Sequence, residues 1–281
     1  MQKDLAYLID NTSLIKLEAR ILMAHILKKY FSLPPSAIIS KSNILLSPNA
    51  FDEWKNLVTR RKRGEPIAYL LGKKGFHAIE LEVNSAVLIP RPETELLVEI
   101  VLNEIKLLEK KFAAPKILDL GTGSGAIALA IANHASRTLV TATDKSAEAL
   151  AIAKLNAKCL ELETRVEFFK GNWYEAIPKN TIFDVIVSNP PYIKAQDPHL
   201  FQGDLRFEPL DALTDHSNGL SCLETIIFGA NKYLKPNGLL SVEHGYDQSG
   251  TVAKLMESAG FRNIETLPDL AGHPRVTSGR K

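Results

Sequence analysis

The sequence predicts an α/β protein, in which a mostly parallel β-sheet flanked by helices follows a small helical domain. Three observations lead to this prediction. Apolar residues near the N-terminus recur at helical spacing, residues 73–88 show partial two-residue alternation, and short apolar strands alternate with helical segments from residue 116 onward. Such alternation is typical of a parallel sheet with helices on both faces. The 281 residues, of which 45% are hydrophobic, suffice for one large and one small domain.

The N-terminal part is predicted to be helical because its apolar residues lie three and four positions apart. The core-facing stripe of the first long helix is expected to consist of Leu14, Leu17, Ile21 and Ala24. Ser47 and Pro48 are typical of an N-cap followed by a first-turn proline. The helix that they begin carries Phe51, Trp54, Leu57 and Val58. We expect these helices to form a domain over residues 1–72.

A change of apolar period marks the expected domain boundary. Residues 73–90 predict a β-hairpin that joins the two domains, because their apolar residues alternate without a helical stripe. The second domain is then expected over residues 91–281. It begins with a helix whose first turn carries Glu93 and Glu95, where carboxylates favour the helix dipole.

Seven strands are expected in the second domain. Only a short polar loop separates the last two, too little for a crossover helix, so they should be antiparallel at the edge of the sheet. The expected strands are residues 117–120, 138–143, 166–169, 183–188, 238–243, 263–267 and 275–278.

Composition and spacing exclude several classes of protein. The longest apolar runs, such as residues 125–132, are shorter than the roughly 20 residues of a membrane span, and the first residues lack a secretory apolar core. We therefore expect a cytoplasmic protein without a membrane partner. The two cysteines form no CxxC pair and the seven histidines show no HxxxH spacing, so we expect no metal.

Basic residues are concentrated near the N-terminus. Residues 1–75 contain 13 Lys and Arg against 6 Asp and Glu, and the remainder contains 21 against 26. The excess peaks at Arg60, Arg61, Lys62 and Arg63. A short basic run is most often a solvated helix end. The alternative is a docking face for an acidic partner or for RNA.

A glycine-rich loop directly follows the strand at residues 117–120. Glycine lets the backbone turn sharply and approach a ligand closely. Asp144 ends the next strand, where its carboxylate can accept both hydrogen bonds of a ribose diol. The loop consists of Gly121, Thr122, Gly123, Ser124 and Gly125. Loop and acid together predict a nucleotide-like ligand, and NAD and S-adenosylmethionine fit them equally well.

Residues beside this loop favour S-adenosylmethionine. Asp119 precedes the loop, where a negative charge suits the amino group and positive sulfur of that cofactor but would repel a pyrophosphate. Trp173, after the third strand, can cover the adenine face, although a core tryptophan fits the sequence equally well. Asn172 beside it can hydrogen-bond the adenine edge.

The fourth strand ends in the turn Asn189, Pro190, Pro191 and Tyr192. Two prolines stiffen the backbone and remove two N–H donors. If the Asn189 side-chain oxygen and the Pro190 carbonyl each accept one N–H bond, a planar amino group is held with its lone pair toward a methyl donor. Tyr192 can stack on that group. The turn therefore predicts methyl transfer to an amino nitrogen.

These motifs resemble those of the HemK-type release-factor glutamine methyltransferases. The turn alone is shared with amino-methyltransferases that act on adenine or cytosine in DNA or RNA. More specific matches to the family are residues 64–69 (GEPIAY), 89–95 (IPRPETE), 196–198 (QDP), 206–209 (RFEP) and 243–245 (EHG). The similarity extends over nearly the whole chain, including the N-terminal helices.

The resemblance implies a Rossmann-like class I methyltransferase fold and a defined reaction. The substrate would be the side-chain amide, N5, of the glutamine in the Gly-Gly-Gln loop of bacterial peptide chain release factors. The cofactor would be S-adenosylmethionine, with S-adenosylhomocysteine as product. Residues 121–125, Asp144, Trp173 and Asn189 would contact the cofactor, and residues 189–192 would hold the glutamine. The N-terminal helices would recognise the release factor.

Three other functions fit the sequence less well. A nucleic-acid amino-methyltransferase would use the same turn, but the chain has no extra target-reading domain. A noncatalytic cofactor-binding factor would not need the paired acceptors around Asn189. A nicotinamide dehydrogenase would leave the proline turn unexplained.

Two features stay ambiguous in the sequence. Residues 193–213 are long for a strand-to-helix connection, so they either fold over the substrate or form a solvent loop. Arg91 either meets a carboxylate on the cofactor or pairs with Glu93 or Glu95.

Overall fold

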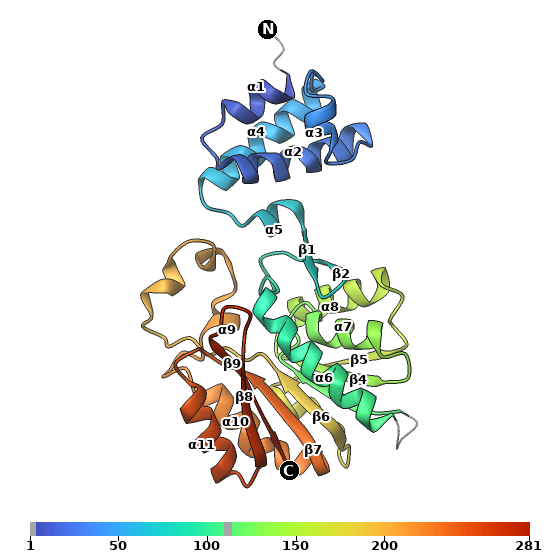
Figure 1. Cartoon of the computed structure of the whole chain (residues 1–281), viewed down its shortest axis with the longest axis vertical. Coiled ribbons are helices and arrows are strands. Elements are labelled where there is room, and N and C mark those ends of the chain that lie inside the picture. The colour runs from blue at the N-terminus through green and yellow to red at the C-terminus, as the bar shows by residue number, and fades with distance from the viewer. Residues whose placement is uncertain (1–3, 110–113) are drawn as a thin grey trace. The chain divides into compact units, whose positions relative to one another are not determined.

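The computed structural model describes residues 4–109 and 114–281. The chain divides into two compact units, Met1–Gly72 and Lys73–Lys281 (Figure 1). The boundary follows Gly72, so the hairpin expected as a separate linker clusters with the larger unit. Within the described ranges, no helix is both long enough and apolar enough to cross a lipid bilayer.

The N-terminal unit consists of helices around one apolar core. Ser47 caps its second long helix by accepting a hydrogen bond from the Ala50 amide, and Pro48 occupies the first turn, as predicted. Trp54 and Leu57 of that helix are buried, and Phe51 and Val58 pack against the core. The helices are α1 (Leu5–Asp10), α2 (Lys16–Phe31), α3 (Ala37–Ser40), α4 (Pro48–Lys62) and α5 (Ile67–Leu71).

The predicted core stripe of α2 is wrong. Leu17 is 66% exposed and Ile21 is 36% exposed, so these residues point away from the core. A second apolar face carries the core contacts instead, through Ala19, Leu22, Met23, Ile26 and Leu27. This second face has more large apolar side chains per turn, so burying it removes more apolar area from water.

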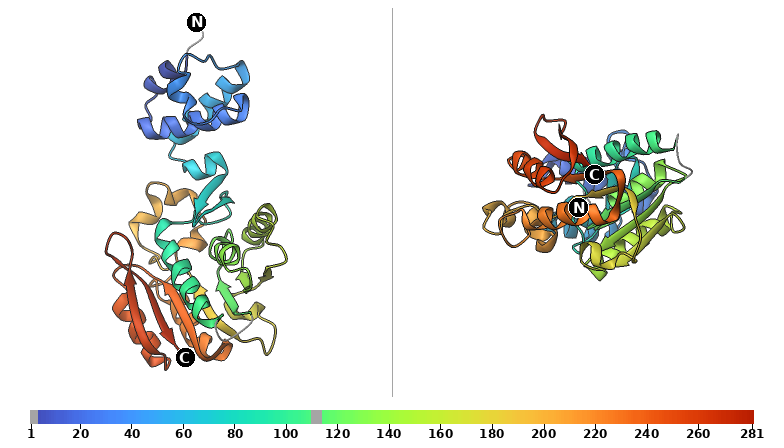
Figure 2. Two further views of the ribbon diagram at one scale, coloured as in Figure 1. Left: turned by 45° about the vertical axis from the view of Figure 1, so that its right-hand side comes forward. Right: turned by 90° about the horizontal axis from the view of Figure 1, so that it is seen from below.

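The larger unit contains the expected α/β sheet (Figures 1 and 2). Seven strands lie in the order β5-β4-β3-β6-β7-β9-β8. The first five are parallel, and β9 is antiparallel to both of its neighbours, as the short loop between the last two strands predicts. The strands are β3 (Lys116–Leu120), β4 (Leu139–Asp144), β5 (Val166–Lys170), β6 (Phe183–Ser188), β7 (Leu234–Glu243), β8 (Arg262–Pro268) and β9 (Pro274–Arg280).

Two groups of helices flank this sheet. One group contacts β3 to β7 and consists of α6 (Glu95–Leu108), α7 (Ala126–His134) and α8 (Ala147–Cys159). The other contacts β7 to β9 and consists of α10 (Ser221–Tyr233) and α11 (Ser249–Ser258). Strand β6 is buried along its whole length, because it lies between two parallel neighbours and under helices. Because the first five strands are parallel, their carboxyl ends lie at the same edge of the sheet.

Short elements complete the unit. The predicted hairpin forms from β1 (Lys73–Phe76) and β2 (Ile79–Glu82), and Asn156 of α8 accepts a hydrogen bond from the Glu82 amide at 2.7 Å. The remaining elements are the 3-10 helices η1 (Pro92–Thr94), η2 (Trp173–Ala176), η3 (Pro198–Phe201) and η4 (Leu205–Phe207), and helix α9 (Leu210–Leu213). Residues 193–213 are thus a folded segment. The Ile193 amide donates to the Leu213 carbonyl and joins its two ends, and the Ala195 amide donates to the Ser217 carbonyl of the following loop.

Candidate active site

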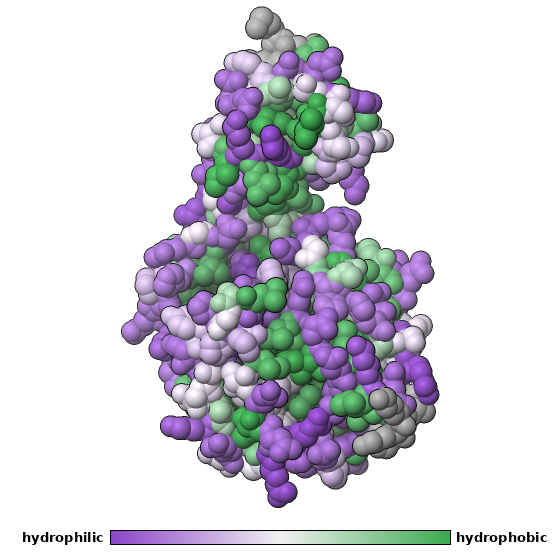
Figure 3. Space-filling model, viewed as in Figure 1, coloured by the Kyte–Doolittle hydropathy of each residue, from purple (hydrophilic) through white to green (hydrophobic). Residues whose placement is uncertain are grey.

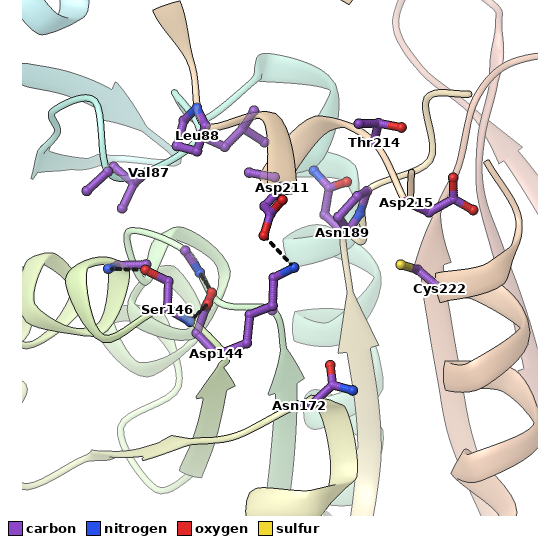
Figure 4. A pocket seen from close by; sticks show the side chains of 18 of the residues that line it. Val87, Leu88, Asp144, Ser146, Asn172, Asn189, Asp211, Thr214, Asp215 and Cys222 are labelled. Carbon is purple, nitrogen blue, oxygen red and sulfur yellow. Dashed lines mark hydrogen bonds and ion pairs between the residues drawn. The ribbon is translucent and has the colours of Figure 1, made fainter. Parts of the chain in front are cut away.

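A cavity of about 510 Å³ lies at the carboxyl ends of the parallel strands. This is the edge at which ligands bind in open α/β sheets, and the volume is typical of a small-molecule site. Figure 4 shows Asp144, Asn172 and Asn189 around this cavity. The segments that contribute to its lining are residues 86–88, 121–123, 144–149, 171–173, 189–191 and 209–216, together with Cys222.

The glycine loop and Asp144 form one wall. Gly121 and Gly123 have positive φ angles of 72° and 56°, which favour glycine, and both line the cavity. The Asp144 carboxylate accepts hydrogen bonds from the Gly123 amide at 2.9 Å and from the Ser146 amide at 2.8 Å. Burial raises the pKa of Asp144. Each carboxylate oxygen keeps a lone pair free, so Asp144 is still able to accept the two hydroxyls of a ribose.

Trp173 lies against the glycine loop. A Cβ added at Gly121 would lie 3.2 Å from the Trp173 ring, so the indole covers this glycine closely. Trp173 also packs against the apolar core, and it lines the cavity together with Asn172. The sequence is compatible with a core tryptophan and with one that covers a ligand. In the structure, Trp173 both packs against the core and lines the cavity.

Asn189 enters the cavity from the end of β6. Its side-chain nitrogen donates a hydrogen bond to the Thr94 hydroxyl at 3.0 Å. Because the nitrogen is engaged there, the side-chain oxygen is the atom left to accept a hydrogen bond from a ligand. Pro191 lines the same cavity, and Pro190 is buried beneath the turn.

Tyr192 is anchored by its hydroxyl, which donates to Glu243 at 3.1 Å. Burial raises the pKa of this tyrosine above its ordinary value, so the phenol stays protonated. Glu243 is 1% exposed at the end of β7, and burial raises its pKa to about 7. Thr94 and Glu243 have no role in the sequence prediction. Only the family motifs at residues 89–95 and 243–245 pointed to these positions.

The remaining predicted site residues are described by the structure but lie outside the set that lines the cavity. Asp119 is fully buried, and it accepts a hydrogen bond from the Thr122 hydroxyl at 2.6 Å. Burial raises its pKa to about 7. Its other oxygen has no hydrogen-bond partner in the described residues. Those that do not line the cavity are Asp119, Thr122, Ser124, Gly125, Pro190 and Tyr192.

Arg91 pairs with neither Glu93 nor Glu95. Its guanidinium forms an ion pair with Glu208, whose side chain is fully buried. The second Glu208 oxygen accepts the Ile89 amide at 2.9 Å. Glu208 therefore connects residues 193–213 to the segment before η1. Pro209 and Asp211 bring residues 193–213 to the cavity wall.

The basic cluster of the N-terminal unit is partly neutralised within that unit. Arg60 forms an ion pair with Glu65, and Arg61 binds Glu18 at 2.8 Å. Lys62 and Arg63 are exposed. The basic run at the end of α4 is therefore a mixed surface of ion-paired and exposed cations.

Taken together, these contacts describe a site for a nucleoside-bearing ligand with an amino-group acceptor beside it. The glycine loop and Asp144 suit the nucleoside, and the Asn189 oxygen suits an N–H donor. Among the described residues, no group of three or more His, Cys, Asp or Glu side chains is arranged to hold a metal ion.

Comparisons with known proteins agree with this description. Residues 93–203 match the methyltransferase small domain, and residues 8–72 match the PrmC N-terminal domain. The chain is 43% identical to a release factor glutamine methyltransferase of Burkholderia pseudomallei, over 98% of this chain and 95% of the relative. It is 44% identical to that of Bordetella pertussis, over 97% of each. A methyltransferase structure from Pyrococcus furiosus shares the fold, with 18% identity, a TM-score of 0.52, and coverage of 81% of this chain and 98% of the other.

Proposed function

The chain belongs to the release factor glutamine methyltransferase family, and from this premise we propose how its site performs the reaction. It is an S-adenosylmethionine-dependent methyltransferase that acts on a release factor glutamine. We propose that the acceptor is N5 of the glutamine in the Gly-Gly-Gln loop of bacterial release factors. The observation that carries this proposal is the Asn189 amide, whose nitrogen binds Thr94 and whose oxygen is left for the substrate.

The residues of the cavity fit the cofactor. When bound, S-adenosylmethionine supplies a methyl carbon activated by a positively charged sulfur. We propose that Asp144 holds the ribose hydroxyls, and that Gly121, Gly123 and Trp173 line the nucleoside. The unpartnered Asp119 oxygen supports the fit, because a buried acid behind the loop is stabilised in its charged form by a nearby cation.

The turn activates the acceptor by orientation. The lone pair of an amide nitrogen is delocalised into its carbonyl, so the nitrogen is a poor nucleophile. In the proposed complex, the Asn189 side-chain oxygen and the Pro190 carbonyl each accept one N–H of the glutamine amide. These bonds fix the nitrogen for in-line attack and stabilise the positive charge that develops on it. The proton leaves after methyl transfer, so no strong general base is needed.

Incubation with intact release factor and labelled cofactor tests this function. We expect one added methyl group on the tryptic peptide that contains Gly-Gly-Gln, detected by mass spectrometry. A release factor in which that glutamine is replaced by alanine is the control and should gain no label. Parallel reactions with DNA and RNA test the alternative substrate, since labelling of nucleic acid alone would contradict the proposal.

We further propose that the exposed apolar face of α2 helps to recognise the release factor. Leu17 is 66% exposed, and Ile21, which is 36% exposed, lies on the same face one turn later. Ile15, the N-cap residue immediately before the helix, is 70% exposed. Figure 3 shows apolar side chains interrupting the polar surface of the N-terminal unit on the face that it draws. Contiguous exposed apolar residues are typical of a protein-binding surface.

Leu17→Asp should weaken the binding of the release factor without changing the rate of methyl transfer. Replacing an apolar side chain that the proposed complex would bury with a charged one should raise KM for the intact release factor by roughly tenfold. Steady-state kinetics with whole release factor and with a short Gly-Gly-Gln peptide measure this change. The peptide should be methylated at the same rate by both enzymes, because it is too short to use a second contact.

Ile39→Asp is the matched control for Leu17→Asp. Ile39 is 80% exposed in α3, which follows the far end of α2. This substitution should leave KM for the release factor close to its original value. Equal KM values for the Leu17 variant and the original enzyme would contradict the proposed recognition surface.

A further inference from the structure

Two buried polar residues lie directly behind the catalytic turn. Thr94, the last residue of η1, is 4% exposed, and Glu243, the last residue of β7, is 1% exposed. Ser188 of β6 pairs with Val242 of β7 in parallel register. Asn189, the residue after β6, and Glu243, the last residue of β7, therefore lie side by side at this end of the sheet.

The Thr94 hydroxyl connects Asn189 to this carboxyl group. Its oxygen accepts the hydrogen bond of the Asn189 amide nitrogen, so its own proton remains to be donated. Thr94 acts on Glu243 as a hydrogen-bonding neighbour that lowers the pKa of the carboxyl. One carboxyl oxygen, Oε2, has no hydrogen-bond partner in the described residues. It is the acceptor available to the Thr94 proton.

The other carboxyl oxygen serves the far end of the same turn. Glu243 Oε1 accepts the hydroxyl proton of Tyr192 at 3.1 Å. The buried carboxylate thus binds Tyr192 directly, and a bond from the Thr94 hydroxyl to its unpartnered Oε2 would link it to Asn189 as well. The two residues that it reaches are the first and last of the Asn-Pro-Pro-Tyr turn.

We propose that Thr94 and Glu243 are positioning residues for methyl transfer, which together hold the Asn189 side chain with its oxygen toward the substrate amide. This inference rests on the proposed function of Asn189. An asparagine amide has two orientations that differ by exchange of oxygen and nitrogen. In the wrong one, an NH₂ group would face the NH₂ group of the glutamine, and two donors would meet without an acceptor. In this proposal the Thr94 hydroxyl donates its proton to the unpartnered Glu243 Oε2, so that its oxygen can only accept from the Asn189 NH₂ group, and this selects the productive orientation.

The charge on Glu243 determines how strongly this carboxylate accepts the proposed hydrogen bonds from Thr94 and Tyr192. Arg275 on β9 and the donors Thr94 and Tyr192 lower its pKa, Glu93 of η1 raises it, and burial outweighs them, giving a pKa of about 7. The adjoining His244 ring is engaged by the Gly245 carbonyl and the Thr277 hydroxyl. As the pH falls through about 7, Glu243 gains a proton, and its neutral carboxyl group becomes a weaker acceptor for its two donors. The arrangement should therefore be complete above this pH and incomplete below it.

Thr94→Val and Thr94→Ser separate a positioning role from a purely structural one. Valine has the shape of threonine without the hydroxyl, whereas serine keeps the hydroxyl. We expect Thr94→Val to lower the single-turnover rate of release factor methylation by about 10²-fold, the cost of a misdirected reacting group. KM for the cofactor should not change, and Thr94→Ser should recover most of the rate.

Glu243→Gln supplies a second readout through pH. With saturating cofactor, the single-turnover rate of the original enzyme should rise with pH through an inflection near 7. The glutamine variant cannot ionise there, so its profile should lack that inflection. Saturation with cofactor keeps the titration of Asp119 behind the glycine loop out of the measurement.

The outcomes distinguish this inference from the function on which it rests. An original enzyme that does not methylate the release factor contradicts the proposed function itself. An active original enzyme with equal rates in the Thr94→Val and Thr94→Ser variants overturns only the positioning roles. An inflection near pH 7 that persists in Glu243→Gln does the same. If Glu243→Gln does not fold, the two Thr94 variants decide the question alone.

Discussion

Asn189→Ala is expected to lower kcat for release factor methylation by about 10³-fold, the typical cost of removing one preorganised polar contact to the reacting group. The variant loses the oxygen that accepts a substrate N–H, so the amide nitrogen is no longer held for attack. The fold should survive, because the asparagine is only half-buried and its loss removes one hydrogen bond to Thr94, worth about 1 kcal/mol. Steady-state kinetics at saturating release factor and cofactor measure the change.

Asn103→Ala is the matched control. Asn103 is an exposed asparagine on α6, and its side chain contacts only the neighbouring Lys106 among the hydrogen bonds of the described residues. The control should retain full activity. If Asn189→Ala kept a kcat within about tenfold of the original enzyme, the amide oxygen would not be the group that orients the substrate.

The sheet was predictable because its signals are local. Each parallel strand is a short apolar run, and β6 from Phe183 to Ser188 was predicted with its observed bounds because it is buried on both faces. The loop between β8 and β9 is too short for a crossover, which fixed the antiparallel edge.

The burial of α2 was not predictable from spacing alone. Leu17 and Ile21 satisfy the helical period as well as Leu22 and Ile26 do, and spacing does not say which face the rest of the domain covers. Packing against the other helices of the unit decided it. The stripe left exposed is the surface that we propose for the release factor.

The site was predictable where its residues follow strands directly. Gly121, Asp144 and Asn189 each lie at the carboxyl end of a parallel strand, and these ends meet at one edge. Thr94 and Glu243 could not be assigned in the same way. Their contacts with the turn join residues 95 and 51 positions apart, and a buried polar side chain shows its partner only when the chain is folded.

The pairing of Arg91 was missed for the same reason. Local spacing offered Glu93 and Glu95 as partners, whereas Glu208 lies 117 positions away. Glu208 is buried and makes two contacts at once: it forms an ion pair with the Arg91 guanidinium and accepts a hydrogen bond from the Ile89 amide. Its contribution to stability is correspondingly testable.

Glu208→Ala is expected to reduce the free energy of unfolding of the larger unit by about 3 kcal/mol. The substitution leaves the Ile89 N–H without its acceptor and the partly buried Arg91 without its counter-charge. For a unit of this size, that loss corresponds to a decrease in melting temperature of roughly 6–12 °C. Thermal unfolding followed by circular dichroism measures it.

Glu208→Gln and Glu163→Ala are the controls for that measurement. Glutamine keeps an oxygen for the Ile89 amide and loses only the charge, so its melting temperature should lie between those of the original protein and Glu208→Ala. Glu163 is exposed in the loop before β5, and its replacement should change the free energy of unfolding by less than about 0.5 kcal/mol. An unchanged melting temperature in Glu208→Ala would mean that residues 193–213 are fastened by their remaining contacts, such as the buried Leu200, and not by this carboxylate.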